Sequence, residues 1–160
     1  MKKILYIMPG WEEKCNYKPY QLLANVAKKN GYEVIHKNID WKKPLSSQIF
    51  SIPHEAVLFG FSLGAILAWL VAQKNPCRHL ILASMTPRHN FTDPIIKKTL
   101  IDLAGKRFVE DVITHLKSTH QAKKQTIIYG DREEETADII VPKTGHRLNN
   151  NYIAEIAKIL

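Results

Sequence analysis

The sequence predicts an open, mostly parallel, doubly wound α/β sheet of about six strands. Short apolar runs, several of them without a polar residue, alternate along the chain with segments that have a helical period. Uninterrupted apolar runs are typical of strands buried on both faces of a parallel sheet. The chain has 160 residues, of which 45% are hydrophobic and 24% charged, so we expect one globular domain spanning residues 1–160.

The first half of the chain predicts three strands with one helix between the first two. Residues 2–8 hold a continuous apolar run that stops at Pro9. Pro19 suits a first helical turn and Gly31 suits a C-terminal cap, which predicts a helix between them. Alternating apolar and polar residues predict the next strand. The strands are expected at residues 32–39 and 55–61, with a short connection at 44–52 that holds one helical turn.

The second half repeats this alternation. Apolar stretches without charges predict further strands, and the segments between them have a helical pattern. The expected strands are residues 78–84, 125–130 and 138–141, and the expected helices are residues 63–74, 94–120 and 150–160. Strands that alternate with helices in this way favour a parallel sheet with helices on both faces.

The net charge of +8 is spread over the chain without an arginine-rich tract or a repeating aromatic and basic pattern, which argues against nucleic-acid binding. Half of the net charge falls between Met85 and Lys124, a region that contains eight Lys or Arg residues and four acidic ones. Such a region is either a solvated helix face or a docking surface for an acidic partner. We expect residues 85–124 to form a small, lid-like helical region within the domain.

The apolar stretch AVLFGFSLGAILAWLVA at residues 56–72 is shorter than the ~20 residues of a membrane helix and contains two glycines, so we expect no membrane span. The N-terminal apolar run is shorter than the core of a signal peptide, which favours a cytoplasmic protein. Cys15 and Cys77 have no metal-ligand spacing. We therefore expect neither a metal nor another cofactor.

Within that stretch, residues 60–64 read GFSLG, the G-x-S-x-G pattern of a nucleophile elbow. A turn that leads directly from a strand into a helix strains Ser62, which we expect to have a positive φ. Neighbouring chains approach it so closely that Gly60 and Gly64 must lack a Cβ. Ser62 is therefore the candidate nucleophile, exposed at the carboxyl edge of the sheet.

A serine nucleophile needs a base, and the base needs an acid that orients it. In folds with this elbow, the acid and then the histidine follow the serine along the chain. Asp131 directly follows the strand QTIIYG, and His146 follows the strand ADIIV, so these are the candidate acid and base. Other carboxylates lie near Asp131 but would have to reach back to the site: Glu133, Glu134, Glu135 and Asp138.

The oxyanion of an acyl-transfer intermediate needs backbone N–H donors. The N–H of Leu63, at the start of a helix, is the first candidate. The second should lie in the loop MPGW after the first strand, where Pro9 has no N–H. Trp11 is our choice, with Gly10 as the fallback, and the Trp11 indole is a candidate wall of the acyl pocket.

These motifs together resemble the α/β-hydrolase family. GFSLG is similar to the family's elbow. The dipeptides GD, with Asp131, and GH, with His146, are similar to the positions of its acid and its histidine, and MPGW is similar to its oxyanion loop. The likeness covers nearly the whole chain, although MPGW lacks the histidine found before the loop glycine in many members. The short chain resembles minimal members that lack the first two strands of the full fold. The resemblance implies a serine hydrolase with a Ser-His-Asp triad and an open cleft.

The expected reaction is hydrolysis of a small carboxylic ester or thioester through an acyl-enzyme, including an acyl group carried on an acidic acyl carrier protein. A neutral histidine base predicts that kcat/KM rises between about pH 6 and 7. A serine peptidase or amidase would use the same residues. A hydrolase-fold protein that binds an acidic partner without turnover is the alternative outside the enzymes.

Overall fold

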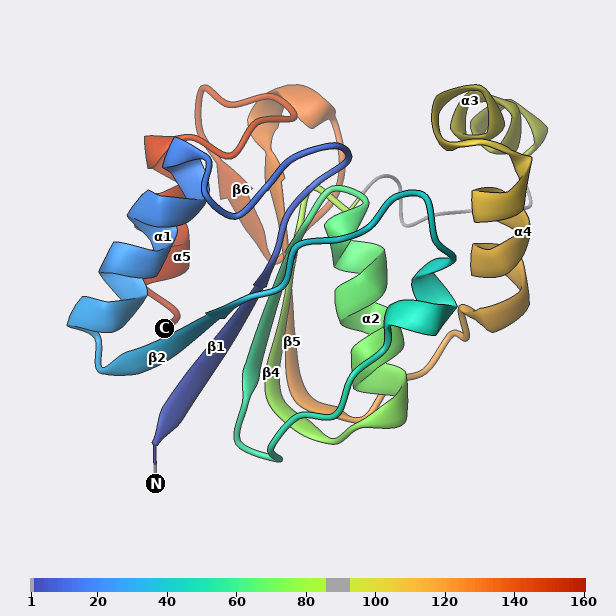
Figure 1. The fold of residues 1–160 in the computed structure, drawn as a ribbon. Helices are drawn as coiled ribbons and strands as arrows, with labels where there is room; N and C mark the ends of the chain where they lie inside the picture. The colour runs from blue at the N-terminus through green and yellow to red at the C-terminus, as the bar shows by residue number, and fades with distance from the viewer. Residues whose placement is uncertain (1, 86–92) are drawn as a thin grey trace.

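The computed structural model describes residues 2–85 and 93–160, and these form a six-stranded parallel sheet (Figure 1). The strands lie in the order β2-β1-β3-β4-β5-β6, and every neighbouring pair is parallel. Their bounds are β1 (Lys3–Met8), β2 (Tyr32–His36), β3 (Val57–Phe61), β4 (Cys77–Ala83), β5 (Ala122–Gly130) and β6 (Ile139–Val141). The predicted fold class is confirmed. In a parallel sheet all the carboxyl ends meet at one edge, which gathers the loops that follow the strands.

Helices cover both faces of this sheet (Figure 1). The helices α1 (Lys18–Lys29) and α5 (Asn150–Ala157) pack side by side on one face, over a cluster of buried apolar residues. The helix α2 (Gly64–Lys74) lies on the other face, and eight of its eleven residues are buried. The 3₁₀ helix η1 (Leu45–Gln48) packs beside it, and α3 (Pro94–Ala104) and α4 (Lys106–His115) lie farther out.

The stretch that was expected to be one helix over residues 94–120 is two. Gly105 has a φ of +88°, which interrupts the helical hydrogen bonding between α3 and α4. The chain then leaves the helix after His115, and β5 begins at Ala122, three residues earlier than predicted. The turn between α3 and α4 therefore depends on a glycine, which adopts a positive φ without strain.

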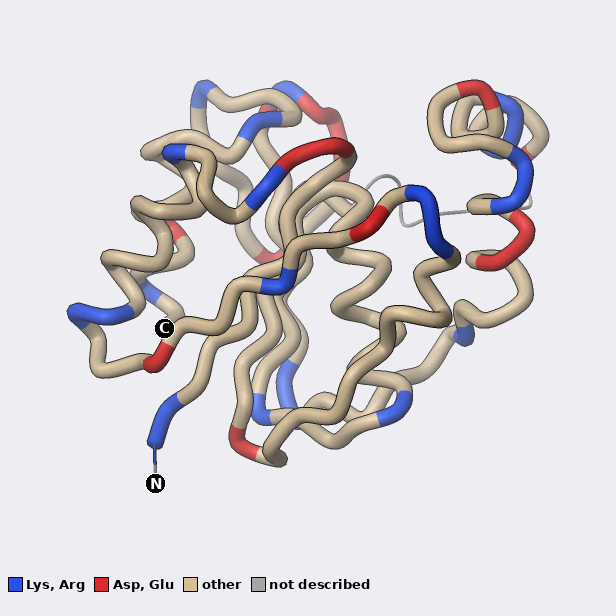
Figure 2. Tube along the Cα trace, in the orientation of Figure 1, with Lys and Arg blue, Asp and Glu red and all other residues tan. Residues whose placement is uncertain are grey.

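The positive charge between Met85 and Lys124, predicted to be either a solvated helix face or a docking surface, is divided among α3, α4 and the start of β5 (Figure 2). Arg88 and the rest of residues 86–92 lie outside the described residues. Lys123 forms an ion pair with Glu55 at the start of β5, which is the end of the sheet opposite the carboxyl edge. Residues 93–115 hold four cationic and four acidic side chains: Lys97, Lys98, Lys106 and Arg107, and Asp93, Asp102, Glu110 and Asp111. The pair α3–α4 thus has no excess of positive charge.

The apolar stretch at residues 56–72 divides as its sequence predicts. It forms the buried strand β3, a turn at Ser62 and the helix α2. None of the helices in residues 2–85 and 93–160 is long and apolar enough to cross a membrane.

Candidate active site

Ser62 occupies the turn between β3 and α2 with a φ of +53°, which confirms the expected strained conformation. A residue with a Cβ avoids this region of the Ramachandran map unless surrounding contacts hold it there. Here the Ser62 N–H donates to the carbonyl of Ala83 on β4, at 2.9 Å. The strain is therefore fixed by the sheet, and Ser62 stands at its carboxyl edge.

The two elbow glycines are needed for close approach, as predicted. A Cβ on Gly60 would lie 2.5 Å from the Cα of Ala65, and a Cβ on Gly64 would lie 2.1 Å from the carbonyl oxygen of Pro9. Both separations are far below any real carbon contact. The first turn of α2 can approach the end of β1 only because Gly64 has no side chain.

His146 lies beside Ser62, as expected for its base. Its Nε2 is 2.8 Å from the Ser62 Oγ, and its Nδ1 is 2.7 Å from Oε1 of Glu133. When Nδ1–H donates to the carboxylate, Nε2 is left unprotonated and can accept the hydroxyl proton of Ser62. The Phe61 ring packs against the imidazole with the ring centres 5.4 Å apart, and the His146 side chain remains 45% exposed. The imidazole therefore faces an open surface, but Ser62, which was expected to be exposed, is buried beneath it with only 8% of its surface accessible.

The carboxylate at His146 belongs to Glu133, which corrects the prediction of Asp131. Asp131 accepts hydrogen bonds from the backbone N–H groups of Lys143 and Thr144, at 2.7 and 2.8 Å. These bonds from Thr144 and Lys143 hold the pKa of the Asp131 carboxyl below its usual range. Asp131 thus fixes the loop that carries His146 but does not contact the imidazole.

Glu133 takes the place predicted for Asp131 because of η2 (Asp131–Glu133), a 3₁₀ turn directly after β5. With three residues per turn, the third residue of a 3₁₀ helix lies on the same side of the helix as the residue before it, one turn farther along the axis. Glu133 therefore reaches back, and its Oε2 accepts the N–H of Gly130 at 2.7 Å. A glutamate at the third position of a helix is a recognised capping signal, and here it also brings the carboxylate to the site.

Hydrogen bonds from several neighbouring groups hold the Glu133 carboxylate in place. Its Oε2 also accepts a hydrogen bond from Ser84 Oγ at 2.6 Å, and Ser84 Oγ lies 2.7 Å from the hydroxyl of the buried Tyr152. Burial on its own would raise the pKa of Glu133, but the hydrogen bonds from His146, Ser84 and the Gly130 N–H outweigh it and lower the pKa. The carboxylate is thus ionised and held in place. Ser84 and Tyr152 were not predicted as site residues, because no sequence motif marks them.

The two N–H groups expected to bind an oxyanion remain candidates. In the described part of the chain, neither the Leu63 N–H nor the Trp11 N–H forms a hydrogen bond. Gly10, the fallback donor, already forms hydrogen bonds: its N–H donates to the Tyr20 hydroxyl at 2.9 Å and to Glu13 at 3.2 Å. A Cβ on Gly10 would lie 3.4 Å from the Cβ of Ser62, so this loop lies directly against Ser62.

The Trp11 side chain belongs to an aromatic cluster. Its ring centre lies 4.8 Å from that of Trp41 and 6.1 Å from that of Phe108 on α4. The cluster joins the loop after β1 to the helical pair α3–α4. The Trp11 indole is therefore packed between elements, and its proposed place in the acyl pocket stays a prediction.

Within residues 2–85 and 93–160, no group of three His, Cys, Asp or Glu residues could hold a metal ion. Cys15 and Cys77 are buried and free, and burial raises the pKa of each thiol to about 11. At neutral pH both thiols are protonated, which leaves them weak nucleophiles. Ser62 is therefore the better-placed nucleophile.

Comparison with solved structures decides the type of fold. A presumed hydrolase from Agrobacterium vitis S4 superposes with a TM-score of 0.73 at 13% identity, over 99% of this chain and 86% of that one. The mouse alpha/beta hydrolase domain-containing protein 10 gives 0.68 at 13% identity, over 98% and 87%. Est1E from Butyrivibrio proteoclasticus gives 0.62 at 12% identity, over 99% and 85%.

This chain has the α/β-hydrolase fold. No protein-family model and no curated protein matches it by sequence. At 12–13% identity the likeness of these hydrolase-fold structures establishes the architecture, including the carboxyl edge where Ser62 and His146 lie. The chemistry of the site has to be argued from its own residues.

Proposed function

We propose that this protein is a serine hydrolase that cleaves a carboxylic ester or thioester through an acyl-enzyme. The observation that carries the proposal is the chain of hydrogen bonds from Ser62 Oγ to His146 Nε2, at 2.8 Å, and from His146 Nδ1 to Glu133, at 2.7 Å. A nucleophile, a base and an orienting acid within hydrogen-bond reach are the parts that acyl transfer requires. The named hydrolases among the structural neighbours support the same reaction class.

In the first half of the reaction, Ser62 Oγ attacks the carbonyl carbon and its proton passes to His146 Nε2. The carbonyl oxygen becomes an oxyanion, which the N–H groups of Leu63 and Trp11 would stabilise. Glu133 stays ionised and stabilises the imidazolium. The bond from the carbonyl carbon to the leaving oxygen or sulfur then breaks, and His146 returns the proton to the leaving group.

In the second half, water attacks the acyl-enzyme while His146 takes one of its protons. The new tetrahedral intermediate collapses, the bond to Ser62 Oγ breaks, and the proton returns from His146 to the serine. The products are a carboxylic acid and the free enzyme. The exposed His146 edge gives water direct access to this step.

Esters and thioesters are favoured over amides on chemical grounds, because resonance with nitrogen stabilises an amide carbonyl against nucleophilic attack. A serine peptidase or amidase would use the same three residues. A panel of ester, thioester and anilide substrates with a common acyl group separates these classes. Anilide turnover at a rate equal to that of the ester would replace the esterase proposal with an amidase.

The first test is covalent labelling by a fluorophosphonate probe, followed by intact mass. We expect one adduct on the wild type and none on Ser62→Ala. We expect labelling at least ~10²-fold slower on His146→Ala, because general-base catalysis contributes about 10²- to 10⁴-fold. Ser51→Ala is the matched control, since Ser51 is exposed and precedes β3, whose opposite end leads to Ser62. A folded wild type that acquires no adduct would refute an activated serine.

A carrier-bound substrate and a non-catalytic role on an acidic partner both depend on a basic docking surface. The equal numbers of cationic and acidic side chains over residues 93–115 do not favour such a surface. Our proposal is therefore limited to a small acyl substrate. Reversing the charge of Lys97, Lys98, Lys106 and Arg107 together is expected to leave hydrolysis of small esters within about twofold, since exposed charges act weakly over distance.

A further inference from the structure

Ser84 directly follows β4, at the carboxyl edge of the sheet, and is fully buried. Its φ is +44°, a conformation that a residue with a Cβ rarely adopts. In this conformation its Oγ lies 2.6 Å from Oε2 of Glu133. Strained backbone conformations that persist in a fold cluster at functional sites. The strain at Ser84 coincides with a direct contact to the proposed acid.

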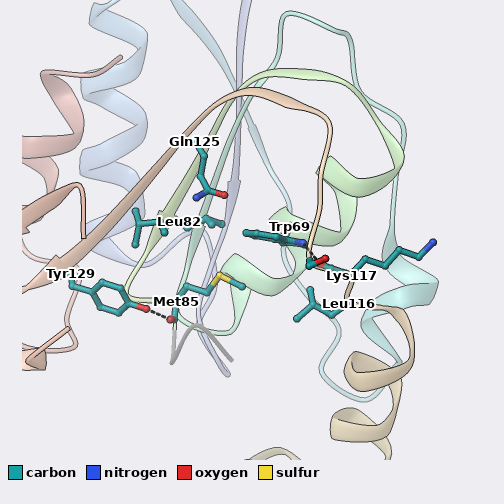
Figure 3. A pocket seen from close by; sticks show the side chains of 9 residues that line it. Trp69, Leu82, Met85, Leu116, Lys117, Gln125 and Tyr129 are labelled. Atoms are coloured by element: carbon teal, nitrogen blue, oxygen red, sulfur yellow. Dashed lines mark hydrogen bonds between the residues drawn. The ribbon is translucent and has the colours of Figure 1, made fainter. Parts of the chain in front are cut away.

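Hydrogen bonds hold the turn at Ser84 from both faces of the sheet. The Ser84 N–H donates to the Ile128 carbonyl on β5, at 2.7 Å. On the α5 face, the Tyr152 hydroxyl lies 2.7 Å from Ser84 Oγ. On the α2 face, Tyr129 donates its hydroxyl proton to the carbonyl of Met85, the next residue along the chain, and both line a cavity of about 520 Å³ beside α2 (Figure 3). Relaxing the strained turn would break these bonds, so the Ser84 hydroxyl has a fixed position.

The two carboxylate oxygens of Glu133 have different partners. Oε2 accepts the Gly130 N–H at 2.7 Å and the Ser84 hydroxyl at 2.6 Å. Oε1 is left for the Nδ1 of His146, at 2.7 Å. The terminal torsion of a glutamate is soft, so a carboxylate held by one N–H alone could rotate away from the imidazole. Ser84 provides the second donor on Oε2, which fixes the plane of the carboxylate.

The hydroxyl groups of this network form a directed chain of donors. Ser84 has one hydroxyl proton and donates it to Glu133, so in its contact with Tyr152 it acts as the acceptor. The Tyr152 hydroxyl also lies 2.7 Å from the Ile128 carbonyl and shares its proton between the two acceptors. Hydroxyl groups bonded in series polarise one another, which strengthens the last bond of the chain. The donors run from Tyr152 through Ser84 to Glu133 and favour its ionised form.

We propose that Ser84 is a positioning residue of the active site, which holds Glu133 in the orientation that binds His146, and that Tyr152 orients the Ser84 hydroxyl. The inference rests on the proposed function, because it takes Glu133 as the acid of the reaction. Ser84 and Tyr152 are both fully buried, so neither contacts a substrate. Their effect should therefore appear in kcat and leave KM unchanged.

The first test compares Ser84→Ala with Ser84→Gly, which lose the same hydroxyl. In each variant, kcat for p-nitrophenyl acetate should fall about 10- to 100-fold, as expected for one lost bond to a charged group, with KM within about twofold of the wild type. Their stabilities should differ, because glycine adopts a positive φ without strain and Ser84→Gly should melt at the higher temperature. If the hydroxyl served stability alone, kcat would follow the melting temperature.

Combining Ser84→Ala with Glu133→Gln tests whether Ser84 acts through the carboxylate. The carboxylate is already absent in Glu133→Gln, so adding Ser84→Ala to it should change kcat by less than about twofold. A purely structural role of Ser84 would instead lower kcat by the same factor in both backgrounds. This comparison also removes any loss of packing that Ser84→Ala causes on its own.

Tyr152→Phe removes the donor to Ser84 and should lower kcat by about threefold to tenfold. Tyr32→Phe is the matched control, because the buried Tyr32 donates its hydroxyl to the Leu160 carbonyl at 2.8 Å, at the start of β2 and thus at the opposite end of the sheet. It should keep the wild-type kcat.

Three results would overturn the role of Ser84 while leaving the hydrolase intact. These are a wild-type kcat in both Ser84 variants, a kcat that follows the melting temperature, or a full additional loss in the double variant. If the wild type neither cleaves the ester nor takes the fluorophosphonate label, the proposed function itself fails.

Discussion

Glu133 and Asp131 lie in the same three-residue turn after β5, yet their carboxylates contact different groups. Glu133 meets the imidazole of His146, while both oxygens of Asp131 accept backbone N–H groups from the loop at Lys143 and Thr144. Glu133 would therefore stabilise the positive charge of His146, and Asp131 would fix the position of the loop that carries His146. The two roles predict different kinetic consequences.

Substituting Glu133 by Gln should lower kcat by about 10²- to 10⁴-fold, because a neutral amide no longer stabilises the imidazolium and allows the wrong tautomer. Asp131→Asn should lower kcat by less than about tenfold while it reduces the melting temperature, since one of two bonds to the loop is lost. Steady-state kinetics and thermal unfolding of both variants provide the measurement. A larger loss of kcat in Asp131→Asn than in Glu133→Gln would restore Asp131 as the acid.

At the scale of the element, the elbow depends on how closely α2 approaches β1. Gly64 is the contact point, because a Cβ there would lie 2.1 Å from the Pro9 carbonyl oxygen. The same approach places the loop at Gly10 against Ser62. Gly64 therefore determines both the start of α2 and how close the loop after β1 lies to Ser62.

Replacing Gly64 by Ala should destabilise the protein by about 3 kcal/mol and abolish most activity, because backbone atoms must move to relieve the overlap. Gly31→Ala is the matched control. Gly31 has a φ of +83° but open space around its Cβ position, so we expect a cost of only about 1 kcal/mol and full activity. Urea unfolding and ester hydrolysis measure the two effects. Equal losses in both variants would mean that backbone strain, and not close approach, explains the elbow glycine.

The elements that could be predicted from the sequence are those with a strong local signal. Several strands contain continuous apolar runs, and the two glycines of GFSLG indicate the tight turn in which Ser62 has a positive φ. The sequence predicts Asp131 in place of Glu133 because the 3₁₀ turn that brings Glu133 back to His146 has no strong signal. The position of α3–α4 depends on contacts with η1 and α2 that are distant in sequence.

At the scale of the whole molecule, the two ends of the sheet contain different buried polar groups. The carboxyl edge holds Ser62, Glu133 and Ser84 near Tyr152 of α5, whose hydroxyl also donates to the Ile128 carbonyl at 2.7 Å. Nearer the other end, the buried His79 on β4 bonds Thr126 on β5 at 2.8 Å. His79 is too far along the sheet to take part in the proposed reaction, so its titration reports on stability alone.

Burial, with the nearby charges of Lys124 and Arg78, lowers the pKa of His79 to about 4. An unfolded chain binds this proton near pH 6.5, so from pH 6.5 down to about 4 the unfolded state takes up a proton that the folded state does not. Stability is therefore complete above pH 6.5 and falls as the pH drops. The lowered pKa of Glu133 acts on stability only below about pH 4.3, where its unfolded form titrates, so the window from pH 7 to 5 belongs to His79.

Between pH 7 and pH 5, the free energy of unfolding of the wild type should fall by about 2 kcal/mol more than that of His79→Gln. Urea unfolding at pH 7, 6 and 5 measures the slope, and the comparison of slopes removes any constant loss of packing in the variant. His54→Gln is the control, because His54 is exposed and should leave the wild-type slope unchanged. Equal slopes in the wild type and His79→Gln would mean that the folded protein accepts a proton at His79 as readily as the unfolded chain does. In that case, the sheet would have to open around β4 and β5 near pH 5 to hydrate the imidazolium.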